Sequence, residues 1–135
     1  MIRTALICFV LFVVFDSIWF SLVTKNLYLK EFANIGRIID GKFQILYWAA
    51  ALVYLLLSIG LAYFVFSQFD ENVSLTKVFL SGALFGLVCY GVYDMTNLAT
   101  LKDFSIKIAV IDVAWGTFVC GAVTALTYWI STIFK

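Results

Sequence analysis

The fold is decided by a stretch near the end of the chain, KIAVIDVAWGTFVCGAVTALTYWIS, which runs from residue 107 to residue 131. It is longer than the roughly 20 apolar residues that cross a bilayer as an α-helix. Three other stretches share this character, at about 4–24, 44–67 and 78–98. The chain of 135 residues is 64% hydrophobic and 13% charged, which is too apolar for a water-soluble domain of this size. The sequence therefore predicts one all-α transmembrane domain over 1–135, an integral membrane four-helix bundle.

Three aspartates, Asp16, Asp94 and Asp112, lie inside these apolar stretches. A charged side chain at the centre of a bilayer costs on the order of 2.5–3.5 kcal/mol on insertion scales, so such residues usually face a bundle interior or a wet cavity. Asp16 lies towards the end of the first helix, Asp94 near the end of the third and Asp112 near the start of the fourth. Because consecutive helices run in opposite directions, we expect all three carboxylates in the same half of the bilayer.

Basic residues are divided unevenly between the two sides of the predicted membrane domain. Arg3, Lys77 and Lys135 lie on the side of the termini. Six others lie in the first and third loops: Lys25, Lys30, Arg37, Lys42, Lys102 and Lys107. The positive-inside rule then places both of these loops in the cytoplasm and both termini outside. The aspartates are accordingly expected in the cytoplasmic half of the bilayer.

The first loop carries a helical pattern of its own. Tyr28, Phe32, Ile35 and Ile39 recur at spacings of four, three and four residues. This pattern predicts a short amphipathic interfacial helix between the first two membrane helices, ending near Gly41. We expect a connector at the membrane surface, with the alternative that this helix covers the mouth of a pocket.

Small residues predict close helix packing, and polar residues beside the aspartates define a candidate site. Gly82 and Gly86 form a small-xxx-small pair, which permits close backbone approach. Asp16 and Trp19 share one helix face, and so do Asp112 and Trp115. The expected ligand-binding residues, in order of preference, are Asp94, Asp112 and Asp16, then Tyr93, Asn97 and Trp115 as orienting groups, and Trp19 and Tyr47 as further lining.

We expect this pocket to bind a cation or a polar small molecule, with transport as one use. A membrane enzyme acting on a lipid headgroup, through carboxylate acid–base chemistry or a divalent metal, stays an alternative, although the sequence holds no established catalytic motif. A structural or accessory protein whose buried aspartates form hydrogen bonds between helices is the other. Three lysines could neutralise the carboxylates in place of a bound cation, because they lie close enough to the membrane interface to reach inward: Lys25, Lys102 and Lys107.

Composition narrows the cofactors and partners. The chain has no histidine, so neither His-ligated haem nor His-ligated zinc is expected, and the cofactor is otherwise left open. Cys8, Cys89 and Cys120 fit no metal-site spacing and are expected as free thiols. The net charge of +1 indicates no nucleic-acid partner. Membrane lipid is the expected partner, and the many phenylalanines fit lipid contact or a homo-oligomer interface equally.

One segment carries a family resemblance. The sequence YDMTNLATL from Tyr93 to Leu101, followed by DVAWG from Asp112 to Gly116, resembles a pattern of the small bacterial membrane proteins called domain of unknown function 2177. The earlier Asp16-x-x-Trp19 fits as well, while Phe104 stands where many members have tryptophan. The likeness covers essentially the whole chain and implies a multi-pass protein of the bacterial inner membrane. It implies no activity, cofactor or catalytic residue, so the candidate site rests on the physical argument alone.

Overall fold

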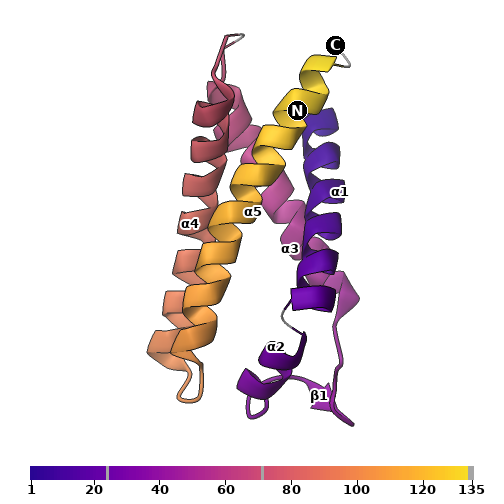
Figure 1. The fold of residues 1–135 in the computed structure, drawn as a ribbon, viewed down its shortest axis with the longest axis vertical. Coiled ribbons are helices and arrows are strands. Elements are labelled where there is room, and N and C mark those ends of the chain that lie inside the picture. The colour runs from indigo at the N-terminus through magenta and orange to yellow at the C-terminus, as the bar shows by residue number, and fades with distance from the viewer. Residues whose placement is uncertain (24, 71, 134–135) are drawn as a thin grey trace.

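Four long apolar helices form the molecule (Figure 1). The computed structural model describes residues 1–23, 25–70 and 72–133. Within these residues four helices are long and apolar enough to cross a membrane. The first is α1 (Ile2–Ile18), which a π-helical turn extends (Trp19–Val23). The second is α3 (Tyr47–Gly60), which is extended by a π-helical turn (Leu61–Val65) and a 3-10 turn (Phe66–Gln68). The third and fourth are α4 (Leu75–Thr100) and α5 (Ile106–Ile133). The prediction of an all-α membrane protein is confirmed.

The first loop contains both a helix and a hairpin. A short helix, α2 (Lys25–Glu31), follows α1, as predicted. The predicted continuation of this helix towards Gly41 is wrong, because β1 (Ile38–Ile39) pairs antiparallel with β2 (Lys42–Phe43). Asp40 and Gly41 connect the strands with φ of 51° and 71°. Two consecutive residues with positive φ form the tight hairpin turn that Asp-Gly favours, and this turn ends any helical pattern.

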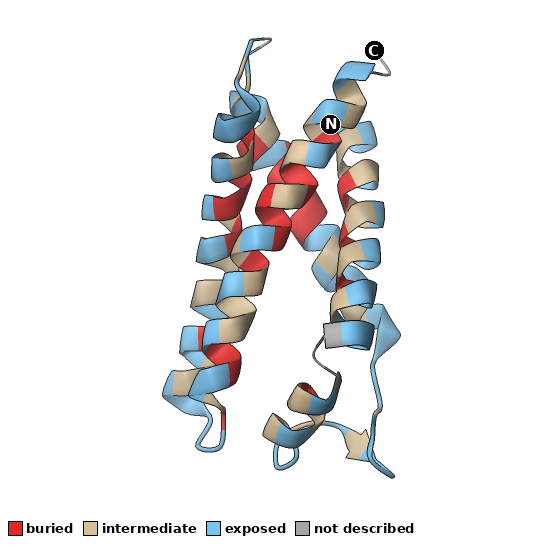
Figure 2. Ribbon diagram, in the orientation of Figure 1, coloured by how far each residue is buried: buried red, intermediate tan, exposed pale blue. Residues whose placement is uncertain are grey.

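The main core lies where α1, α3 and α5 meet. Phe12 of α1, Leu61 after α3 and Val119 of α5 are fully buried there. Figure 2 shows the buried residues concentrated on the inner faces of the helices, with exposed residues on their outer faces. The outward positions are rich in Leu, Val and Phe, which suits contact with lipid rather than water.

The α4 and α5 helices pack closely because glycines line their contact. A Cβ atom at Gly82 would overlap the side chain of Thr124, and one at Gly86 would overlap the carbonyl of Gly116. Gly116 in turn makes room for the ring of Tyr90. The predicted close approach at Gly82 and Gly86 is therefore confirmed, with α5 as the partner helix.

A second, smaller core joins the first loop to the end of the α4–α5 pair. Tyr28 of α2 is buried together with Phe104, Ile108 and Ala109. Figure 1 shows α2, β1 and the α4–α5 turn at one end of the molecule, with the start of α1 and the end of α5 at the other. This arrangement places α2 beside the first turns of α5, where Asp112 lies.

Candidate functional site

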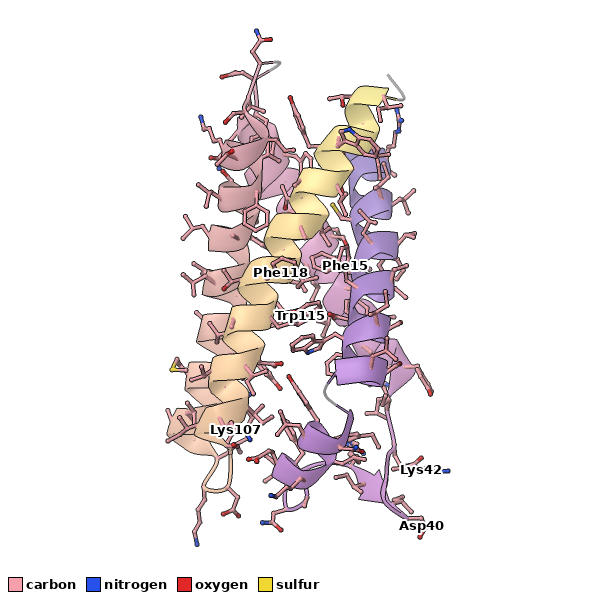
Figure 3. All side chains as sticks on the ribbon, in the orientation of Figure 1. Phe15, Asp40, Lys42, Lys107, Trp115 and Phe118 are labelled. Carbon is pink, nitrogen blue, oxygen red and sulfur yellow. The ribbon has the colours of Figure 1, made fainter. Side chains whose placement is uncertain are left out.

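Asp16 is a buried carboxylate with hydrogen-bond partners on other helices. It lies near the end of α1 and its side chain is 4% exposed. The indole Nε1 of Trp115 on α5 donates a hydrogen bond of 2.8 Å to Asp16 Oδ1. The hydroxyl of Tyr54 on α3 is also in hydrogen-bonding reach of this carboxylate. Figure 3 shows Trp115 between α5 and α1. Asp16 therefore connects three of the long helices.

The two Asp-x-x-Trp segments meet across α1 and α5. Trp19 stacks on Trp115, with ring centroids 4.2 Å apart and an interplanar angle of 4°. The tryptophan of the second segment bonds to the aspartate of the first, Asp16, rather than to its own neighbour Asp112. The segments thus form an interhelical contact that a shared helix face alone does not indicate.

Asp112 accepts a hydrogen bond from α2, the short helix of the first loop. The Tyr28 hydroxyl donates to Asp112 Oδ1, and the Tyr28 side chain is only 7% exposed. Burial, followed by the hydrogen bond to Asp112, raises the pKa of Tyr28, so its hydroxyl remains a protonated donor at neutral pH. The Trp19 indole lies within hydrogen-bonding reach of the same hydroxyl.

Further contacts hold α2 against the start of α5. The Ser105 hydroxyl donates to Glu31 Oε2 at 2.6 Å. The ring of Phe32 lies edge-on to Phe104 at 5.8 Å between centroids and stacks on Tyr28 at 5.7 Å. The first loop therefore packs over the end of the α4–α5 pair, above Asp112.

Asp94 differs from the other two aspartates. It lies in α4 and its side chain is 0% exposed. Neither of its carboxylate oxygens has a hydrogen-bond partner among the described residues. The neighbouring charged group that acts on it is Asp112, which is another carboxylate. A buried polar group left without a partner costs about 1–3 kcal/mol, and more if it is charged.

The three aspartates come from α1, α4 and α5 and lie close enough to interact electrostatically. Asp112 acts on Asp94, and Asp16 acts on Asp112, so Asp112 is the middle member of the row. Within the described part of the chain, no group of three or more His, Cys, Asp or Glu side chains is placed to hold a metal ion. The three aspartates are therefore near one another but do not together form a set of metal ligands among the described residues.

The structure divides the other predicted site residues into two sets. Trp115 and Trp19 lie at the aspartates, and Asn97 is half-buried on α4. Tyr93 and Tyr47 point outward, at 59% and 80% exposed, so neither lines the site in this structure. Tyr93 directly precedes Asp94 on α4, and adjacent helical residues point about 100° apart.

Two residues at the site were not among the predicted lining residues, namely Tyr28 and Tyr54. Tyr28 belongs to the apolar pattern of the first loop, which indicated a surface helix but not a contact with a carboxylate. Lys102 and Lys107, two of the lysines considered as partners for the carboxylates, are exposed. The side chain of Lys25, the third, lies outside the described part of the structure.

No curated protein and no solved structure matches the chain. A family model does match it, over residues 1–129, and its description is "Predicted membrane protein (DUF2177)". This match covers three of the long helices, most of α5, the first loop and all three aspartates, so it confirms the resemblance seen in the sequence. The chain therefore belongs to the DUF2177 family of predicted membrane proteins.

Proposed function

We propose that the protein binds a cation or a polar small molecule between Asp94 and Asp112, with transport across the membrane as one use of this site. The observation that supports the proposal is Asp94, which is fully buried and has no hydrogen-bond partner among the described residues. Buried polar groups in folded proteins are nearly always satisfied, and an exception calls for an explanation. An ionisable residue within a membrane segment is by default a candidate functional site. A bound cation would supply the missing partner.

Asp112 is the second ligand group of the proposal. It lies close enough to Asp94 to interact with it electrostatically and belongs to a different helix, so a ligand held by both carboxylates would connect α4 and α5. Tyr28 occupies one oxygen of Asp112 from the side of the first loop. We place this loop in the cytoplasm, because six of the nine basic residues lie in the first and third loops. The family resemblance is what suggests the inner membrane of a bacterial cell.

Asp16 fits the structural role better than the binding role. Its carboxylate accepts from Trp115 and lies within reach of Tyr54, so its hydrogen-bonding needs are met by the protein. Interhelical hydrogen bonds of this kind contribute roughly 0.6–2 kcal/mol in membranes. We therefore assign Asp16 to helix packing and restrict the proposed ligand contact to Asp94 and Asp112.

Thermal unfolding of the purified protein in detergent tests the proposal. The probes are the chlorides of sodium, potassium, ammonium, magnesium, calcium, ethanolamine and choline, at constant ionic strength. A ligand that binds the folded state raises the unfolding temperature, and a concentration of 100 times Kd contributes about 2.7 kcal/mol. We expect at least one cation to stabilise the wild type but not Asp94→Asn.

The matched control is Asp103→Asn, because Asp103 is an exposed carboxylate at the same end of the molecule. This variant should retain the whole response. An equal response in Asp94→Asn, or no response of the wild type to any probe, would overturn the proposal. Turnover of a lipid headgroup that requires magnesium or calcium would overturn it in favour of the enzyme alternative.

A further inference from the structure

We propose that the cation exchanged at the Asp94–Asp112 pair is a proton, held on Asp94 when the site is otherwise empty and released when another cation binds. This inference rests on the proposed binding site, and it names the species that the site holds in the absence of ligand. It follows from the full burial of Asp94, from the nearby carboxylate of the half-buried Asp112, and from the unequal number of hydrogen-bond donors around the two.

Burial sets the total charge of the pair. Asp94 is fully buried and its acting charged neighbour is Asp112, so two ionised carboxylates would repel each other in a medium of low dielectric constant. A buried charge without a partner is costly, and protein groups respond by becoming neutral. Two carboxyl groups that share a buried site characteristically hold one proton between them.

The donors decide which carboxyl group holds that proton. Asp112 accepts a hydrogen bond from Tyr28, and a donor of this kind stabilises the ionised form of a carboxylate. Asp94 receives no hydrogen bond from any described residue. The negative charge of the pair is therefore best placed on Asp112, and the proton on Asp94.

The titratable groups of the surrounding elements agree with this placement. Helix α5 contributes Asp112, α2 contributes Tyr28, and α1 contributes Asp16 beyond Asp112. On α4 itself, Tyr90 lies close enough to Asp16 and Asp112 to interact with them. Lys102 and Lys107 are exposed. The side chain of Lys25 lies outside the described part of the structure, so the experiment below includes Lys25→Gln.

The exchange is balanced without any redox step. The Asp94 carboxylic acid and a monovalent cation give the Asp94 carboxylate, its bound cation and one free proton. No covalent bond forms or breaks except the O–H bond of the acid. Cation binding should therefore weaken as the pH falls, because protons compete for Asp94.

Infrared difference spectroscopy of the purified protein in lipid vesicles tests the inference. The probe is the C=O stretch of a protonated carboxyl group, which is separate from the carboxylate and amide bands. We expect the wild type to show this band near neutral pH and Asp94→Asn to lose it. Asp94→Glu should keep the band at a shifted position, and Asp103→Asn should leave it unchanged.

The outcomes separate this inference from the proposed function. If no protonated carboxyl band depends on residue 94 in either Asp94 variant, the inference is wrong, even where a cation stabilises the protein. If the band first appears when Lys25 is changed to glutamine, Lys25 is the counter-charge of an ionised Asp94 and the inference is wrong. If the band is present and lost in Asp94→Asn while no cation stabilises the protein, Asp94 holds a proton as inferred, but its exchange for another cation and the proposed function both fail.

Discussion

The indole nitrogen of Trp115 donates a 2.8 Å hydrogen bond to the carboxylate of Asp16, from α5 to α1. Asp94 is at least as deeply buried and receives no such bond from the described residues. The two carboxylates lie in one molecule with the same side-chain chemistry, so their surroundings alone distinguish them. On this contrast rests our proposal that Asp16 is a structural aspartate and Asp94 a ligand-binding one.

Removal of the Trp115 donor should destabilise the helix packing. Trp115→Phe keeps an aromatic ring beside Trp19 but leaves Asp16 without its α5 partner. A buried acceptor left unsatisfied costs about 1–3 kcal/mol, and we expect a loss of this size. This loss of unfolding free energy can be measured by unfolding the protein in mixed micelles with a rising fraction of a denaturing detergent. Trp129→Phe, at an exposed position of α5, should change stability little, and equal losses in both variants would argue against the hydrogen bond.

Glycine substitutions should separate the α4–α5 contact from helix propensity. Gly86→Ala places a Cβ atom against the carbonyl of Gly116, which is rigid backbone, so we expect a loss of roughly 1–3 kcal/mol or more. Gly91→Ala on the same helix meets open space and should be neutral or stabilising by up to about 1 kcal/mol. The same unfolding assay compares the two variants. Equal effects would mean that α4 and α5 do not approach each other closely at Gly86.

Tyr28 should contribute a stabilisation that is constant over the neutral pH range. Burial raises the pKa of Tyr28, so the contribution is complete below the ordinary tyrosine pKa of about 10 and is lost as pH rises through the higher folded-state value. Tyr28→Phe should cost about 1–2 kcal/mol at neutral pH. The exposed Tyr47→Phe is the control. A difference between wild type and Tyr28→Phe that varies between about pH 6 and pH 9 would contradict the assigned protonation state.

The proposed topology, with both termini outside, predicts which loops react from outside the cell. In a background without native cysteines, Asn72→Cys in the loop between α3 and α4 should react with a membrane-impermeant maleimide on intact spheroplasts. Asp103→Cys, in the loop between α4 and α5, should react only after the membrane is opened. The reverse pattern would place the first and third loops outside and would move the proposed site to the other half of the bilayer.

The long helices could be predicted from the sequence because their signal is local. Four apolar stretches of sufficient length have few other stable arrangements in a bilayer, and the small-xxx-small pair at Gly82 and Gly86 indicated the close contact. The loop helix was predicted too long, because the spacing of Ile35 and Ile39 fitted a helix. The Asp40-Gly41 pair, a strong hairpin signal, was present in the same segment and determines its end.

The candidate site could be predicted only in part, because side-chain contacts between helices depend on rotation and depth. Connectivity alone predicted that Asp16, Asp94 and Asp112 would come near each other, and the structure brings them into one row. It did not indicate that Trp115 would bond to Asp16. Tyr93 was expected at the site because it lies four residues before Asn97 in the polar cluster around Asp94, but the helix turns its side chain outward.

The most direct test of the account compares the stability of Asp94→Asn with that of Asp16→Asn, both measured by unfolding of the purified protein in detergent without added ligand. Asp16 accepts from Trp115 and lies within hydrogen-bonding reach of Tyr54, and asparagine has a donor NH2 group in place of one of the two acceptor oxygens, so Asp16→Asn should lose about 1–3 kcal/mol. Asp94 has no hydrogen-bond partner among the described residues, so Asp94→Asn should be as stable as the wild type or more stable. A loss at Asp94 equal to that at Asp16 would show that Asp94 has a structural partner, and would contradict its assignment as the ligand-binding carboxylate.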